Sequence, residues 1–185
     1  MNVLVVYESM FGATRDLADA MTAALREQPG VQVTCLEVGA APERVPDDVD
    51  LLVIGLPTHA FGLSSPESRA EAALLSHRPL VSEGPGVREW LDRLSAADPA
   101  AVRVAVFDTR LTLPGRTGSL VQHRLEGMGF DVSPGRAGFL VTAMTGPLEA
   151  GALERARAWA RSLVTGVSGA TSRGESPRTH VDSSG

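Results

Sequence analysis

The first residues of the chain limit its fold more than any other part. Asn2–Tyr7 is a continuous apolar run rich in valine, with no polar residue between Val3 and Val6. Strands of this kind are buried on both faces, as in a parallel sheet that helices cover. Similar runs recur at Val31–Val38, Asp50–Gly55 and Val102–Asp108, and a weaker one spans Gly129–Val141, where Pro134-Gly135 interrupts it. The sequence therefore predicts five strands of a parallel sheet.

Apolar residues at helical spacing lie between these runs. The predicted buried faces are Leu17, Met21, Ala24 and Leu25; Val87, Trp90, Leu91 and Leu94; and Leu153, Ala156, Ala160 and Leu163, with Leu120–Met128 as a further candidate helix. Strands that alternate with helices imply βαβ crossovers, and hence helices on both faces of the sheet. The predicted fold class is α/β, a three-layer sandwich.

Length, charge and cysteine content exclude several classes of protein. A chain of 185 residues with a net charge of −5 suits one domain, and it argues against a general nucleic-acid binder, which needs a basic surface. The single cysteine, Cys35, excludes an internal disulfide, and four scattered histidines give no credible metal set. Because the chain starts on a strand-like run and holds no long apolar stretch, we expect a cytoplasmic protein without a membrane contact.

Two segments do not fit the alternation of strands and helices. Gly62–Gly86 is long and rich in proline and glycine, although Glu67–Leu75 suits a short helix. This segment is either a lid over a ligand site or a static insertion packed on the sheet edge. Thr165–Gly185 holds 12 glycine, serine or threonine residues among its 21, too little apolar surface to offset the entropy of ordering. We therefore predict one domain over residues 1–164 and a disordered tail over 165–185.

The loop after the first strand is the most specific motif. Ser9, Met10, Phe11, Gly12, Ala13 and Thr14 connect a buried strand directly to an amphipathic helix. Free N–H groups at a helix start, next to hydroxyls and a glycine, suit a phosphate group. The alternative is that Ser9 or Thr14 simply caps the helix. The loop has neither the Walker A ending nor the dinucleotide fingerprint.

These residues resemble the phosphate loop of the flavodoxin family, which follows the pattern Thr/Ser-x-Thr-Gly-x-Thr and binds the 5′-phosphate of FMN. Ser9, Gly12 and Thr14 match the pattern, whereas Phe11 stands where the family usually has threonine. The resemblance covers about residues 1–164 and implies a flavodoxin-like sandwich with strand order 2-1-3-4-5. A Pro-Thr-His-Ala-Phe-Gly stretch further resembles actinobacterial flavodoxin-domain proteins.

The resemblance assigns two more loops to the flavin ring. Pro57, Thr58, His59, Phe61 and Gly62 would wrap the ring, while Asp108, Thr109 and Arg110 would meet its pyrimidine edge or rim. The family usually places an aromatic residue in the third loop, and this sequence has none there. We expect Trp90 and Trp159 to serve packing. Arg69, Arg110 and Arg116 are candidates for positive charge at the rim.

The resemblance implies an FMN-binding electron-transfer protein without catalytic side chains, serving a redox partner protein or a small electron acceptor. Two alternatives stay open. One is an NAD(P)H-dependent quinone or flavin reductase on the same fold, for which the missing aromatic wall leaves room. The other is a flavin-free binding module that kept the fold and lost the cofactor. Fold alone does not decide among them.

Overall fold

The computed structural model describes residues 1–58, 62–76, 79–111 and 116–165. Its centre is a five-stranded parallel sheet of order β2-β1-β3-β4-β5, which confirms the expected order. The strands are β1 (Asn2–Tyr7), β2 (Gln32–Glu37), β3 (Leu51–Pro57), β4 (Arg103–Arg110) and β5 (Arg136–Leu140). The helices are α1 (Ala13–Arg26), α2 (Pro66–Leu75), α3 (Val87–Leu91), α4 (Thr117–Gly127) and α5 (Ala152–Thr165), with 3₁₀ turns at Val38–Ala40 and Pro99–Ala101.

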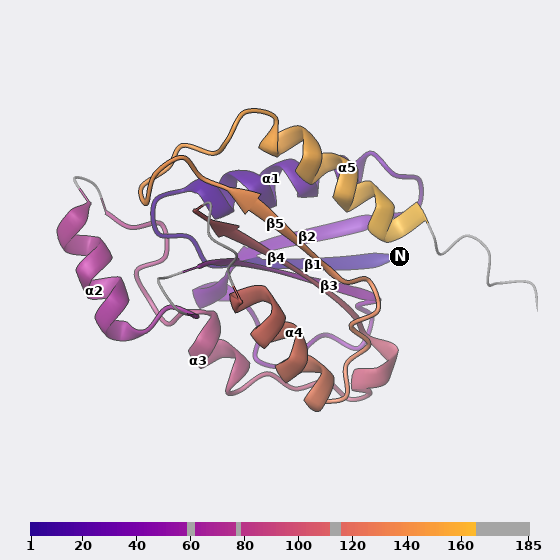
Figure 1. Ribbon diagram of the computed structural model, residues 1–185. Coiled ribbons are helices and arrows are strands. Elements are labelled where there is room, and N and C mark those ends of the chain that lie inside the picture. The colour runs from indigo at the N-terminus through magenta and orange to yellow at the C-terminus, as the bar shows by residue number, and fades with distance from the viewer. Residues whose placement is uncertain (59–61, 77–78, 112–115, 166–185) are drawn as a thin grey trace, which may run out of the picture.

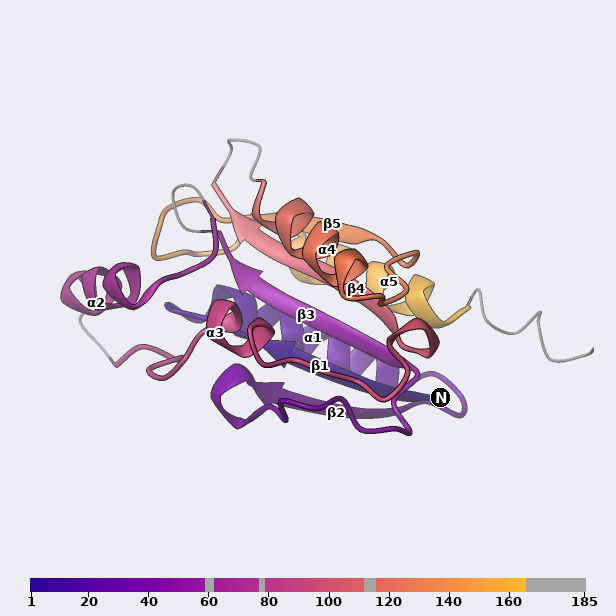
Figure 2. The same cartoon turned by 90° about the horizontal axis from the view of Figure 1, so that it is seen from below.

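Helices cover both faces of the sheet, so the molecule has three layers (Figure 1). Alternate residues of each strand point to opposite faces. Val3 and Val5 of β1 therefore pack with α1 and α5, whereas Leu4 and Val6 pack with α3 and α4. Seen from below, α2 stands apart from these layers, beyond the carboxyl ends of the strands (Figure 2). Only Ala72 of this helix is buried.

A glycine lets two central strands pack on the α1 and α5 side. Gly55 lies in β3 beside Phe107 of β4, and a Cβ at position 55 would sit 2.2 Å from the Phe107 ring. Phe107 meets Phe139 and Trp159 edge to face, with ring centroids 6.3 and 6.4 Å apart. The second tryptophan, Trp90, is buried on the other face and donates its indole N–H to Pro42 O. Both tryptophans serve packing, as predicted.

Element boundaries depart from the sequence prediction at several places. β3 and β4 run two residues further than expected because their pairing continues to Pro57 and Thr109. The strand expected over 129–141 begins only at Arg136, since Pro134-Gly135 forms a turn in which Gly135 has φ +81°. Leu94 follows α3 rather than ending it, yet is buried.

Some predicted faces also differ from those observed. Leu153 is exposed on α5 instead of facing the core. Cys35 in β2, which from its place in an apolar run we expect to be a buried small hydrophobe, is only partly buried. α5 continues through Thr165, one residue past the predicted domain end, and the predicted tail beyond it lies outside the described residues. In the part of the chain that is described, no helix has the length and apolar character needed to cross a membrane.

Candidate functional site

The loop between β1 and α1 lies at the point where the strand order reverses. β1 pairs with β2 on one side and with β3 on the other, so the loop after β1 opens at the switch point of the sheet. Ligands of open α/β sheets bind in this crevice, outside the carboxyl ends of the strands. The predicted phosphate loop therefore lies where open α/β folds bind their ligands.

The N-terminus of α1 has free hydrogen-bond donors. Its N-cap is Gly12, which adopts a left-handed conformation with φ +103° and has no side chain to cap the helix. The first intrahelical bond is donated by Asp16 N–H to Gly12 O. The N–H groups of Ala13, Thr14 and Arg15 therefore lack an intrahelical acceptor, as the first turn of any helix does. The helix dipole adds a partial positive charge at the same place.

The two hydroxyls of the loop have different partners. Ser9 Oγ accepts the Gly12 N–H at 3.1 Å, and as a hydroxyl it keeps its own hydrogen to donate. Thr14 Oγ1 lies 3.0 Å from Thr109 Oγ1 at the end of β4. Neither hydroxyl caps the free N–H groups of the first turn. The capping alternative thus holds only for Gly12 N–H, and both side chains are buried against the loop.

A guanidinium also lies at this loop, which the sequence reasoning did not single out. Arg15 NH2 lies 3.3 Å from the position that a Cβ on Gly12 would take, so the Arg15 side chain folds back over the loop. It pairs with Asp16 at 3.2 Å, and both side chains are about half exposed. A basic residue in the first turn of the helix is the signal that identifies it in the sequence.

The other two predicted loops start later than the sequence suggested. Pro57 still belongs to β3 and pairs with Thr109, while Thr58 N–H donates to Thr109 O at 2.8 Å. Thr58 Oγ1 is buried and has no hydrogen-bond partner among the described residues. Gly62 is partly buried, whereas His59 and Phe61 lie outside the described part of the chain.

Asp108 and Arg110 are in β4 and face the α4 side of the sheet. The Asp108 carboxylate accepts the backbone N–H of Gly118, in the first turn of α4, and lies 3.7 Å from the Arg110 guanidinium. Burial raises the pKa of Asp108, although Arg110 and Arg136 act against this. The Arg110 guanidinium packs over Gly138 of β5. Of the predicted rim arginines, Arg110 is therefore partly neutralised by an ion pair.

The segment 62–86, called the arm below, contacts the phosphate loop directly. Val81 N–H donates to Met10 O at 3.0 Å, and Ser82 N–H donates to Ser9 O at 2.8 Å. Ser9 N–H in turn donates to Ser82 Oγ at 3.0 Å. These bonds hold residues 81–82 against the backbone of the loop. They favour the static insertion over the lid for this part of the arm.

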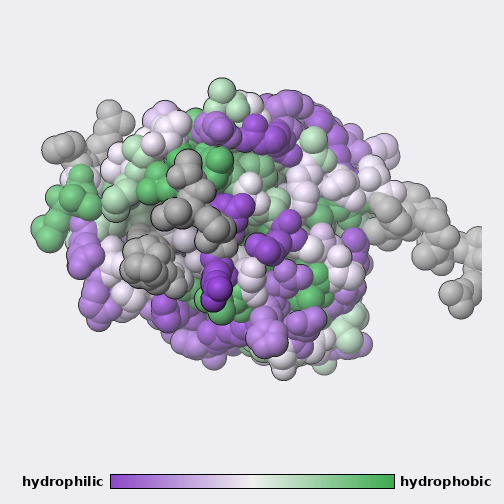
Figure 3. Space-filling view, viewed as in Figure 1, coloured by the Kyte–Doolittle hydropathy of each residue, from purple (hydrophilic) through white to green (hydrophobic). Residues whose placement is uncertain are grey.

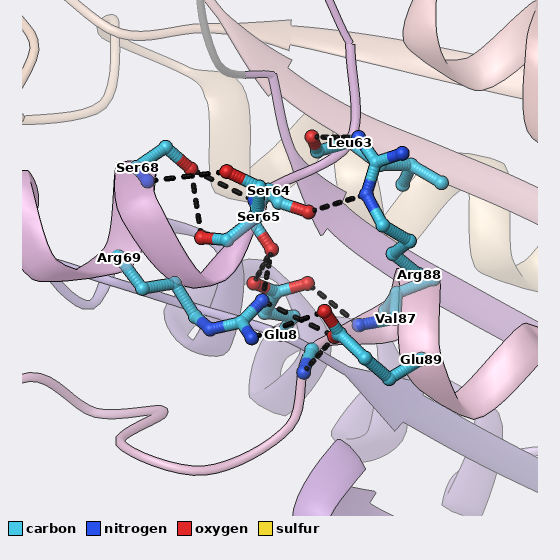
Figure 4. Close-up of polar contacts among 10 residues, drawn as sticks. Glu8, Leu63, Ser64, Ser65, Ser68, Arg69, Val87, Arg88 and Glu89 are labelled. Atoms are coloured by element: carbon cyan, nitrogen blue, oxygen red, sulfur yellow. Dashed lines mark hydrogen bonds and ion pairs between the residues drawn. The ribbon is translucent and has the colours of Figure 1, made fainter.

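Both ends of the arm meet at Glu8, the residue immediately before the phosphate loop. Glu8 is fully buried and accepts hydrogen bonds from Ser64 Oγ and from Val87 N–H (Figure 4). Burial raises the pKa of Glu8, and its two hydrogen bonds and Arg69 act in the opposite direction. Arg69, expected at the rim, is instead largely buried and pairs with Glu89. Sequence reasoning missed Glu8, Ser64 and Glu89.

A cavity of about 730 Å³ lies between α2 and the returning half of the arm. Its lining is mainly apolar, and the Arg69–Glu89 pair supplies polar atoms. Of the residues predicted for the site, only Arg69, expected at its rim, lines this cavity. Leu74 and Leu75, at the end of α2, are exposed apolar residues. Figure 3 shows apolar surface at the left of the molecule, where Figure 1 places α2.

Comparison with solved structures identifies the fold as that of flavodoxins. Flavodoxin 1 from Bacillus cereus superposes with a TM-score of 0.62 at 15% identity, covering 89% of this chain and 97% of that one. Flavodoxin 2 from the same organism gives 0.61 at 19% identity, with 88% and 97% covered. A Streptococcus pneumoniae flavodoxin gives 0.58 at 17%, with 90% and 100% covered. No family model matches the sequence, and no curated protein sequence matches it either.

Proposed function

We propose that this protein binds FMN non-covalently and serves in electron transfer in the cytoplasm. The observation that carries the proposal is the open N-terminus of α1: Gly12 leaves it without a capping side chain, at the switch point of a flavodoxin fold. Flavin, when bound, supplies the redox chemistry, and the protein contributes binding, orientation and electrostatics.

The phosphate end of FMN fits the donors of the loop. A dianion gains charge-assisted hydrogen bonds from backbone N–H groups and hydroxyls, and it is stabilised by the helix dipole. The available donors are the N–H groups of Ala13, Thr14 and Arg15, together with the Ser9 hydroxyl and, when Thr109 Oγ1 donates to it, the Thr14 hydroxyl. The Arg15 guanidinium adds a positive charge beside Gly12. This charge compensates for the missing threonine hydroxyl, which the family pattern has at the position of Phe11.

The ring of FMN would lie over the ends of β3 and β4. Thr58 Oγ1 is a buried polar atom without a partner among the described residues, and such an atom is costly unless a ligand or water satisfies it. It is therefore a candidate donor or acceptor for the polar edge of the ring. Pro57–Gly62 would wrap the ring, and Thr109 and Arg110 would lie at its edge, as the resemblance implies.

An absorption spectrum of the freshly purified protein gives the first test, because bound oxidised flavin absorbs in the visible range. A fluorescence titration of flavin-free protein with FMN and with riboflavin gives the second. We expect FMN to bind far more tightly than riboflavin, since only FMN offers a phosphate to the α1 N-terminus. Equal affinities, or no binding of either flavin, would overturn the proposal.

The electron acceptor would be a redox partner protein or a small molecule. Steady-state oxidation of NADH and NADPH, with and without a quinone, separates a carrier from a reductase. A carrier consumes neither nucleotide at a catalytic rate when FMN is bound. Rapid turnover would instead assign the protein to the reductases.

A further inference from the structure

A buried carboxyl connects the phosphate loop to the arm. Glu8 follows β1 on the face that carries α3 and α4, and its side chain has no exposure to solvent. Ser64 Oγ donates to one carboxyl oxygen from the start of the arm. Val87 N–H donates to the other, at 2.8 Å, from just beyond the end of the arm. One side chain thus holds both ends of the arm together (Figure 4).

A second set of contacts surrounds this carboxyl. Arg69 NH1 donates to Ser64 Oγ at 3.0 Å, and the two terminal nitrogens of the Arg69 guanidinium contact the two oxygens of Glu89 at 3.2 Å. Gly86 N–H donates to Glu89 Oε2 at 2.7 Å. Burial acts against ionisation of Glu89, but the Arg69 and Gly86 hydrogen bonds hold its pKa below the ordinary value. Glu89 therefore keeps Arg69 in place beside Ser64.

Glu8, Ser64 and Arg69 pack so closely around Gly86 that no space remains there for a side chain. A Cβ on Gly86 would sit 2.6 Å from Arg69 NH1, 2.7 Å from Ser64 Oγ and 2.8 Å from Glu8 Oε1. Side chains from three segments therefore converge on one glycine. Arg88 closes the outer side by donating to the carbonyl oxygens of Leu63 and Ser64, at 2.7 and 2.9 Å. A network this complete fixes one arrangement of the arm.

The arm then returns to the loop that Glu8 precedes. Residues 81–82 bond to the backbone of Ser9 and Met10, as described above. The start of the phosphate loop is thus held in two ways. The side chain of Glu8, just before the loop, binds both ends of the arm, and residues 81–82 of the arm bind the backbone of the loop. Backbone N–H groups stabilise an anion best when they are fixed in position before it binds.

We propose that Glu8 is a positioning residue for the flavin phosphate: by fastening the arm to the end of β1, it fixes the Ser9–Thr14 loop, and with it the free N–H groups at the start of α1, in their anion-binding arrangement. The inference rests on the proposed function. Glu8 does not touch the phosphate in this account, because its carboxyl is directed to Ser64 and Val87. Its effect on the cofactor passes through the shape of the loop.

The test compares Glu8→Ala with the unchanged protein in titrations with FMN and with riboflavin. Removing the carboxyl leaves Val87 N–H and Ser64 without their partner, which loosens the arm. We expect FMN affinity to fall by about tenfold or more, the effect of roughly 1.4 kcal/mol, while riboflavin affinity changes less than about twofold. A purely structural role would weaken both flavins equally or neither, and either result would overturn the proposal.

Three further variants keep the test decisive. Ser64→Ala removes one donor and leaves Glu8 in place, so it serves if Glu8→Ala does not fold; we expect the same selective loss, but smaller. Glu8→Gln keeps the shape of the side chain and an acceptor for Val87 N–H, so it should restore most of the FMN affinity. Glu71→Gln, on the exposed side of α2, is the matched control and should change nothing.

Hydrogen exchange of the flavin-free proteins separates this inference from the proposed function. If the unchanged protein binds no FMN, the proposed function fails, but exchange still reports on the loop. We expect the amides of Ser9–Thr14 to exchange faster in Glu8→Ala than in the unchanged protein, because the arm no longer holds them. Unchanged exchange in this loop would show that Glu8 does not position it, whatever the flavin result.

Discussion

The hydroxyl of Thr14, in the first turn of α1, lies 3.0 Å from the hydroxyl of Thr109, at the end of β4. The bond joins two of the three predicted ligand loops across the top of the sheet, over a sequence separation of 95 residues. Thr109 O also accepts the N–H of Thr58, from the remaining loop. Thr109 therefore connects the segments that would hold the phosphate with those that would hold the ring.

Thr14→Ala should weaken FMN binding selectively. A hydrogen bond to a charged group contributes about 1.5–3 kcal/mol, so we expect FMN affinity to fall by roughly ten- to a hundredfold. Riboflavin affinity should change little because riboflavin has no phosphate. Thr109→Val is the matched control: it removes the partner hydroxyl but leaves Thr14 free to donate. The reverse ranking in a fluorescence titration would assign the important hydroxyl to Thr109.

Arg15→Gln tests the charge beside Gly12. The Arg15 guanidinium is about half exposed and shares its charge with Asp16, so solvent screens its attraction for a phosphate. We expect a loss of FMN affinity of roughly two- to fivefold, corresponding to about 0.5–1 kcal/mol, and a weaker dependence of that affinity on salt. Asp16→Asn removes the competing carboxylate and should act in the opposite direction. An identical salt dependence in all three proteins would show that Arg15 does not face the phosphate.

The sheet could be predicted from the sequence because each central strand is an apolar run that only a doubly covered sheet can bury. β1 was predicted to the residue. The predicted ends of β3 and β4 are too short, because Pro57, Thr109 and Arg110 lack apolar character and are held in the strands by pairing with neighbouring strands. These pairing partners come from distant parts of the chain, and the periodicity of the local sequence does not predict them.

The candidate site was predictable only where its residues are adjacent in the sequence. The phosphate loop is a local motif, and its position after β1 follows from the fold. Glu8 and its partners could not be found in this way, since Ser64 and Val87 lie 56 and 79 residues further along the chain. We expect Arg69 at a solvated rim because arginine is mostly exposed. In the structure its side chain is largely buried, where it pairs with Glu89 and donates to Ser64 Oγ.

The stability of the protein should depend on pH through Glu8. Burial raises the pKa of this carboxyl above its ordinary value of 4.5, with Arg69 opposing the shift and Glu89 adding to it. Its protonated form is therefore the one that folding favours. The stability it contributes is fully present below pH 4.5 and is lost as pH rises through the raised pKa.

Urea unfolding of the unchanged protein and of Glu8→Gln, in steps from pH 5 upward, measures this effect. Glutamine does not ionise, so the free energy of unfolding of the unchanged protein should fall relative to that of the variant as pH rises. Glu89, whose folded pKa is lowered, is present in both proteins, so its own titration cancels in the comparison. A constant difference across the range would show that the Glu8 pKa is not raised.

Gly86→Ala should destabilise the protein, although alanine can adopt the backbone conformation of Gly86 without strain. Gly86 has φ −92°, which any residue adopts, so the cost comes from space alone. Its new methyl group would lie within 2.8 Å of Arg69, Ser64 and Glu8, and one or more of them must move. Overpacking of this kind costs about 1–3 kcal/mol. Gly84→Ala is the matched control in the same arm, where a Cβ would meet nothing within 4 Å.

If the contacts at Glu8 hold the arm against the phosphate loop, the two glycine variants should also differ in flavin binding. Gly86→Ala should lower FMN affinity more than riboflavin affinity, because displacing Glu8 or Ser64 releases the loop that holds the phosphate. Gly84→Ala should leave both affinities and the unfolding midpoint unchanged. If Gly86→Ala lowered the unfolding midpoint while the ratio of FMN to riboflavin affinity stayed constant, the contacts would stabilise the arm without positioning the loop.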